Sequence, residues 1–146
     1  MSSLKFVVRP SVVLPDHRPL FKVTQILLVL FLASRAKKTS ILRLQLFNWV
    51  LKDNARRIKL SRVAATKDAM FPAWGLDPAL DAAVSFAKGE GLIEPSGTGI
   101  KLTQSGEEFC AVTMKHKIFE QDIEFLQSIG MSITETIVEK MVGEWI

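Results

Sequence analysis

The sequence predicts a mainly α-helical protein that carries one small β-hairpin. Apolar side chains recur at helical spacing in several segments, and most of these segments begin near a Ser, Thr or Asp that can cap a helix. The clearest strand signal is a pair of short apolar segments that flank a glycine-rich turn. With 146 residues, 48% of them hydrophobic, the chain is long and apolar enough to form one domain around its own core.

The chain is expected to begin with an extended arm over residues 1–19, because the three prolines of this segment disfavour a helix. A helix over residues 20–35 follows. Its centre, Ile26–Leu32, is apolar on every side, so this helix should lie in the middle of the core or under a partner. The apolar run is much shorter than the roughly 18 residues of a membrane span, and no signal peptide is visible. We therefore expect a soluble, cytoplasmic protein with no membrane partner.

Three helices are expected in the middle of the chain. A Thr-Ser pair can cap a helix over residues 40–53, and the basic segment from Asn54 is expected to form the next one. The loop that follows holds Trp74, which is expected to be exposed. Asp77 precedes a proline, and this pair is a strong start signal for the helix that leads to the hairpin.

The hairpin is expected to consist of the strands Leu92–Glu94 and Ile100–Leu102. The helix behind it can be capped by Thr103 or by Ser105, and two more helices follow. The last of them is expected to begin at Ser132, which has capping-box spacing to a glutamate three residues later.

Charge is distributed unevenly along the chain. Residues 35–67 hold ten Lys or Arg and one acid, whereas residues 68–146 hold thirteen acids and five bases. Within the basic segment, four cations fall inside seven residues and could contact phosphates or a protein partner: Arg56, Arg57, Lys59 and Arg62. Because residues 52–67 contain no aromatic side chain, stacking on single-stranded nucleic acid is not supported there. We favour a solvated face, pairing with the acidic half, or a protein partner over DNA.

The helix in front of the hairpin lacks the residues that read DNA bases. Residues 77–90 contain Asp77, Asp81, Lys88 and Glu90, but no Arg, Asn or Gln. Base readout in the major groove depends on such side chains, and phosphates would repel the net negative charge. This alanine-rich face is better suited to packing on protein.

The residues that support common catalytic or metal chemistry are missing or badly spaced. The two histidines are far apart in the chain, and the single cysteine, Cys110, is expected to be a buried core residue. The acidic run from Glu120 through Asp122 to Glu124 is expected to be solvated. No phosphate-binding glycine loop is present. We therefore predict no catalytic residues, no metal site, no cofactor and no enzymatic activity.

The order helix, helix, helix, hairpin, helix is that of a winged helix, and the segment Leu102-Thr-Gln-Ser-Gly106 resembles the sequence after the wing in many bacterial winged-helix proteins. We expect residues 20–112 to form this domain, with residues 113–146 packing on it as extra helices. Ser40–Trp49 and Asp77–Ile93 resemble the small middle components of bacterial three-component ABC-ATPase systems, which include Lamassu-type phage defence.

This resemblance implies a non-catalytic, DNA-associated accessory subunit that binds an SMC- or Rad50-like ATPase and an effector subunit, often a nuclease. On this interpretation the expected partner-binding residues also include Trp74, Asp77, Asp81 and Trp145. The alternative is a dimeric transcription regulator that binds DNA through residues 35–67. A scaffold with no nucleic-acid role is a third class.

Overall fold

The computed structural model describes residues 19–144 of the chain. They form a mainly α-helical fold with a small antiparallel sheet, as the sequence predicted. The expected N-terminal arm lies outside these residues, except for Pro19, the first residue of the first helix. The α-helices in this part of the chain are α1 Pro19–Ala33, α2 Ile41–Val50, α3 Asn54–Thr66, α4 Pro78–Gly89, α5 Gln104–Thr113, α6 Glu120–Ile129 and α7 Glu135–Gly143. The strands are β1 Lys38–Thr39, β2 Ile93–Ser96 and β3 Gly99–Leu102.

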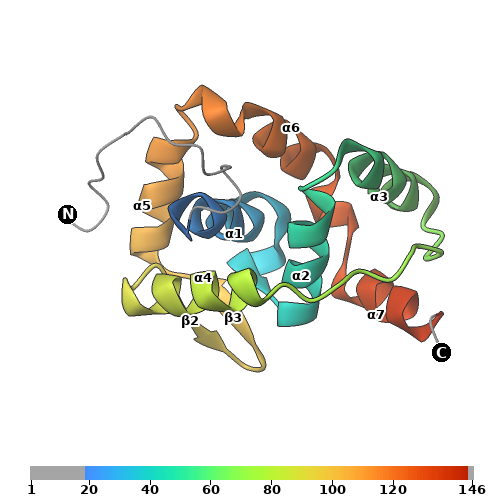
Figure 1. The fold of residues 1–146 in the computed structure, drawn as a ribbon, viewed down its shortest axis with the longest axis horizontal. Coiled ribbons are helices and arrows are strands. Elements are labelled where there is room, and N and C mark those ends of the chain that lie inside the picture. Colours follow the sequence, from blue (N-terminus) through green and yellow to red (C-terminus); the bar gives the residue numbers. More distant parts are fainter. Residues whose placement is uncertain (1–18, 145–146) are drawn as a thin grey trace.

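Helix α1 forms the centre of the molecule (Figure 1). It packs against α2, α4, α5 and α6, and its residues from Val23 to Leu30 are buried. The apolar helix expected from the sequence is therefore enclosed by other helices of the same chain. Burial of each of its leucines contributes about 1.5–3 kcal/mol before the loss of conformational entropy is subtracted. None of the helices within residues 19–144 has both the length and the apolar character needed to cross a bilayer.

The sheet has the strand order β1-β3-β2, and both pairings are antiparallel. Strand β1 was not expected from the sequence. It lies between α1 and α2 and places Thr39 opposite Ile100. A side chain at Gly99 would overlap the carbonyl oxygen of Thr39, so this glycine allows β1 to approach the hairpin. Along the chain, helices α1, α2, α3 and α4 precede the β2–β3 hairpin, and α5 follows it.

Three of the expected helix caps are present. The side chains of Ser40, Asp77 and Thr103 accept hydrogen bonds from backbone amides in the first turns of α2, α4 and α5. Two alternatives were wrong. Ser105 lies inside α5, and α7 is capped by Thr134 rather than by Ser132, which belongs to a short 3₁₀ turn.

Close packing explains the glycine in the segment that follows the hairpin. A Cβ atom at Gly106 would overlap both the carbonyl oxygen of Leu92 and the side chain of Leu102. The first turn of α5 therefore rests directly on the base of the hairpin.

The C-terminal helices cover the helical core. Helix α6 contacts α1 and α3, and α7 contacts α2. Ile133, Val138 and Met141 are almost fully buried. These apolar residues pack inside the chain's own core. Trp145 lies outside the described residues.

Candidate functional site

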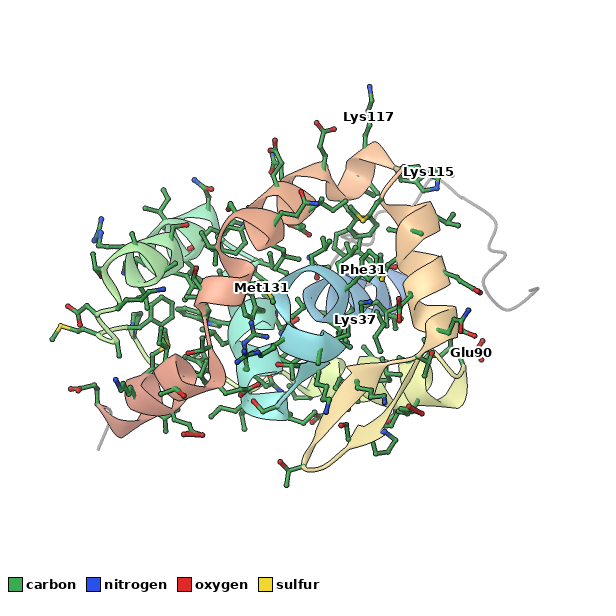
Figure 2. The ribbon with its side chains drawn as sticks, turned by 180° about the vertical axis from the view of Figure 1, so that it is seen from behind. Phe31, Lys37, Glu90, Lys115, Lys117 and Met131 are labelled. Atoms are coloured by element: carbon green, nitrogen blue, oxygen red, sulfur yellow. The ribbon has the colours of Figure 1, made fainter. Side chains whose placement is uncertain are left out.

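The ten cations of residues 35–67 divide into two groups. Five of them contact groups within the folded chain: Lys37, Arg43, Lys52, Arg56 and Arg57. The other five are exposed: Arg35, Lys38, Lys59, Arg62 and Lys67. Figure 2 shows one of the engaged cations, Lys37, beside Phe31; its ammonium lies 5.6 Å from the ring centre and 3.0 Å from a carboxylate oxygen of Glu107. About half of the basic segment is therefore occupied internally.

Arg43 is buried, with 3% of its surface exposed. Its guanidinium donates to the carbonyl oxygens of Ile133 and Gly130 at 2.7 and 3.0 Å, and also to that of Ala33. It further donates to the hydroxyl groups of Ser34 and Thr39 at 3.0 and 3.2 Å.

Burial lowers the pKa of Arg43 to about 10, against the opposing influence of Glu135, so the group is charged at neutral pH. Its role is to join the end of α1 to the turn before α7.

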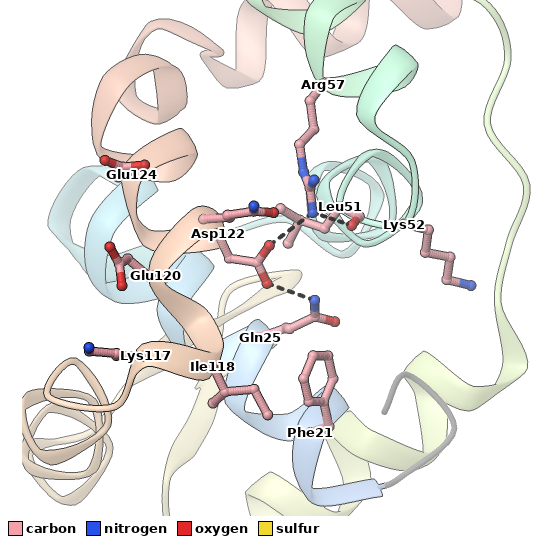
Figure 3. A pocket seen from close by; sticks show the side chains of 11 residues that line it. Phe21, Gln25, Leu51, Lys52, Arg57, Lys117, Ile118, Glu120, Asp122 and Glu124 are labelled. Atoms are coloured by element: carbon pink, nitrogen blue, oxygen red, sulfur yellow. Dashed lines mark hydrogen bonds and ion pairs between the residues drawn. The ribbon is translucent and has the colours of Figure 1, made fainter. Parts of the chain in front are cut away.

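Arg57 pairs with an acid that the sequence suggested would be solvated. A terminal nitrogen of Arg57 lies 3.0 Å from Asp122 Oδ1, and Gln25 donates to Asp122 Oδ2 at 3.0 Å (Figure 3). Burial raises the pKa of Asp122, against the lowering effects of Gln25 and Arg57. These side chains form part of the wall of an open pocket of about 820 Å³ between α1, α3 and α6. The expectation for Asp122 was therefore wrong: it is a buried link between three helices.

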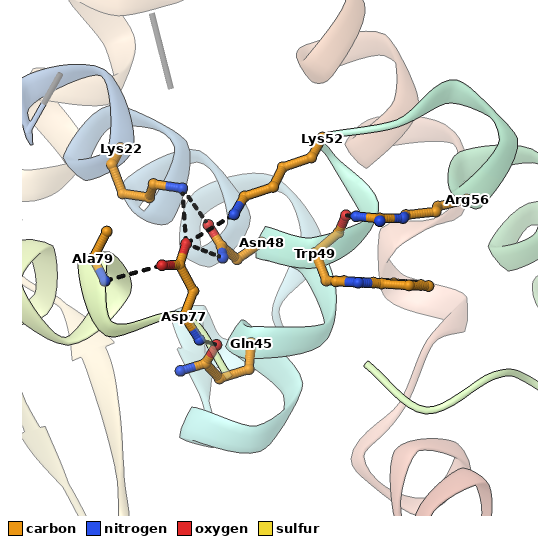
Figure 4. A network of polar contacts seen from close by, with 8 residues as sticks. All are labelled: Lys22, Gln45, Asn48, Trp49, Lys52, Arg56, Asp77 and Ala79. Atoms are coloured by element: carbon orange, nitrogen blue, oxygen red, sulfur yellow. Dashed lines mark hydrogen bonds and ion pairs between the residues drawn. The ribbon is translucent and has the colours of Figure 1, made fainter. Parts of the chain in front are cut away.

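Asp77 is the centre of a second polar network (Figure 4). Its Oδ2 accepts from Lys52 at 2.9 Å, from Asn48 at 3.0 Å and from Lys22 at 3.2 Å. Its Oδ1 accepts from the backbone amide of Ala79. Burial alone would raise the pKa of Asp77, but these hydrogen bonds hold it well below its ordinary value. With 19% of its side chain exposed, this carboxylate fixes the start of α4 against α1 and α2.

Trp74 does not form the exposed contact that the sequence suggested, because only 6% of its surface is exposed. Its ring meets Phe71 edge to face at 6.3 Å, and Phe71 meets Trp49 in the same way at 6.0 Å. On α3, Arg56 lies over Trp49, 3.9 Å from the ring centre, and donates to the Trp49 carbonyl oxygen (Figure 4). This series of contacts anchors the loop between α3 and α4.

Of the expected partner-binding acids, Asp81 remains exposed on α4. The outward face of α4 also presents Lys88, alanines and Phe86, which is partly exposed. The helix that would enter a DNA groove in a winged helix therefore offers no guanidinium or carboxamide group for base contacts.

The four predicted cations of α3 do not act together. Arg56 and Arg57 contact the body of the protein, whereas Lys59 and Arg62 are exposed and border a groove of about 410 Å³. We call this the α3 groove. It is lined by Lys59, Arg62, Val63, Thr66, Asp68, Met70, Phe71 and Pro72. The apolar residues beside the two cations were not expected from the sequence.

Within the described part of the chain, no group of His, Cys, Asp and Glu side chains is arranged to hold a metal ion. Cys110 is buried, as expected, and burial together with Glu107 raises its pKa to about 12. The thiol is therefore protonated at neutral pH, which does not suit a nucleophile. In comparisons with known proteins, no family model, curated protein or solved structure matches this chain.

Proposed function

We propose that this chain is a non-catalytic, winged-helix accessory subunit that binds an SMC- or Rad50-like ATPase and helps to assemble a DNA-sensing antiphage complex with an effector subunit. The observation that carries the proposal is the contrast between two helices. Helix α4 exposes Asp81 and is held against the core by the hydrogen bonds of Asp77. Helix α3, in contrast, presents Lys59 and Arg62 beside apolar side chains that are exposed to water.

The physical argument concerns what each surface can bind. A phosphate-lined groove would repel the acids of α4, and short alanine side chains make no bidentate contacts with bases. An exposed apolar surface with cations at its edge resembles a protein interface, in which an apolar centre is surrounded by polar groups. The resemblance of Ser40–Trp49 and Asp77–Ile93 to middle components of ABC-ATPase systems provides the identity of the partner in this proposal.

The test is co-purification from the native operon. The full chain, with an affinity tag, is expressed with its neighbouring genes, and an ATPase of the SMC or Rad50 type is expected to elute with it in a fixed ratio. A well-behaved monomer that elutes without an ATPase would contradict the proposal. Addition of nuclease to a parallel sample distinguishes a protein contact from co-purification through shared DNA.

The second candidate is a dimeric transcription regulator that binds DNA through residues 35–67. The observation in its favour is that five exposed cations of this segment form no ion pair within residues 19–144: Arg35, Lys38, Lys59, Arg62 and Lys67. If Lys59 and Arg62 contact phosphates, their double replacement by alanine should make the plot of log affinity against log salt concentration less steep. Each lost phosphate contact lowers the slope by about 0.9, so the double variant should lower it by about 1.8. Sequence-selective binding by the purified chain alone would favour this function over the first.

A further inference from the structure

We propose that the α3 groove is the docking site for an acidic amphipathic helix of the partner ATPase, an inference that rests on the proposed function. Lys59 and Arg62 are three residues apart on α3 and therefore share one face of the helix. No acidic side chain within residues 19–144 forms an ion pair with either of them. Two neighbouring cations are therefore available to a negatively charged partner.

Apolar side chains next to these cations are exposed to water. Ile58 on α3 is 54% exposed, and Met70, in the loop that follows, is 77% exposed. Met70 lines the groove together with Val63 and Phe71, which are buried, and Ile58 lies on α3 next to Lys59. A partner that covers Ile58 and Met70 would remove apolar surface from water, and each Å² buried in this way favours binding by about 25 cal/mol of free energy.

Contacts with the rest of the protein hold both walls of the groove in place. Arg56 stacks on Trp49 and Arg57 pairs with Asp122, so one side of α3 is held against α2 and α6. Phe71 contacts Trp49 and Trp74, which holds the loop that forms the other wall. A prearranged groove loses little side-chain entropy when it binds.

The composition of the groove favours a protein helix over nucleic acid. Phosphates would pair with Lys59 and Arg62 but would leave Ile58 and Met70 in water. Base stacking needs exposed aromatic rings, whereas Phe71 is buried. A helix with carboxylates and aliphatic side chains three or four residues apart satisfies both the cations and the apolar surface. Asp68 also lines the groove, where its carboxylate accepts a hydrogen bond from the Met70 amide, so the partner's carboxylates should face Lys59 and Arg62.

The experiment places a photo-crosslinking amino acid, p-benzoylphenylalanine, at Thr66 of the full chain, which is expressed with its neighbouring genes. Thr66 lines the groove and is exposed. After irradiation of the purified complex, mass spectrometry identifies the attached peptide. We expect a segment of the ATPase in which acidic and aliphatic residues alternate at helical spacing.

A charge-reversal pair tests the role of the cations. Lys59→Glu with Arg62→Glu should lower the crosslink yield at least tenfold and leave the thermal unfolding of the isolated chain unchanged. The matched control is Lys115→Glu with Lys117→Glu, the same change in charge at exposed positions between α5 and α6 that do not line the α3 groove (Figure 2). The control should retain the crosslink.

The outcomes separate the two proposals. If the ATPase co-purifies but Thr66 attaches to nucleic acid, to a second copy of this chain, to a basic segment or to nothing, the groove assignment is wrong and the proposed function stands. An unchanged crosslink yield in the reversed variant also overturns the groove assignment. If the ATPase does not co-purify with the native chain, both proposals are wrong.

Discussion

Replacement of Arg43 by methionine should be strongly destabilising. The substitution keeps much of the side-chain volume but removes five hydrogen bonds, three of them to backbone carbonyls. The Ser34 hydroxyl keeps its bond to Val29, and the Gly130 carbonyl oxygen keeps its bond from the Ile133 amide. The carbonyl oxygens of Ala33 and Ile133 and the buried hydroxyl of Thr39 lose the bonds that Arg43 supplied. At the lower figure of about 1 kcal/mol for each unsatisfied buried group, the free energy of unfolding falls by about 3 kcal/mol.

The assay is urea unfolding followed by tryptophan fluorescence and by circular dichroism. With a slope of about 1.5 kcal/mol per molar urea, a loss of about 3 kcal/mol lowers the midpoint by about 2 M. Arg43→Lys retains the charge but not the fork of donors, so an intermediate loss is expected. Arg35→Met, at an exposed position, controls for the removal of one charge. A midpoint shift of less than about 0.5 M in Arg43→Met would refute the reasoning.

Three further predictions concern other contacts. Because the pKa of Asp77 is lowered in the folded protein, its carboxylate stabilises the fold fully above about pH 4 and progressively less as the pH falls through the folded-state pKa. Asp77→Asn should therefore lower the free energy of unfolding by roughly 1–2 kcal/mol at neutral pH. In urea unfolding, the difference between the native chain and this variant should shrink below about pH 4. A difference that stays constant with pH would argue against the network. Gly106→Ala should lower the thermal midpoint by several degrees because its Cβ meets Leu92, whereas Gly143→Ala, with open space around it, should be neutral or slightly stabilising. Trp74→Ala should lower the free energy of unfolding by about 3–5 kcal/mol and make the loop before α4 susceptible to limited proteolysis. An unchanged digestion pattern would show that the aromatic contacts do not anchor this loop.

Local chemistry explains which elements could be predicted. The caps at Ser40, Asp77 and Thr103 were found because a capping side chain and its amide lie within three residues of each other. The apolar centre of α1 was equally clear from a short window of sequence. Strand β1 was missed because two residues carry no periodic pattern and are defined only by pairing with β3.

Contacts between distant residues explain most of what was missed. Asp122 forms an ion pair with Arg57, which lies 65 residues earlier in the sequence, and Arg43 donates a hydrogen bond to Ile133, 90 residues later. No local pattern shows that such polar groups are buried. For the same reason, four cations close together on α3 looked like one site, although Arg56 and Arg57 are bound to the protein body. Only Lys59 and Arg62 remain for a partner, and the neighbouring Met70 comes from a separate loop.

The position of Arg43 in the chain has a consequence for biosynthesis. During translation its guanidinium emerges 90 residues ahead of Ile133, whose carbonyl oxygen is one of its acceptors. Until that later segment leaves the ribosome, the nascent chain can bury this cation only with its hydrogen bonds incomplete. The N-terminal portion should therefore remain loosely packed on the ribosome, open to chaperones, and should consolidate only after the last helices have been made.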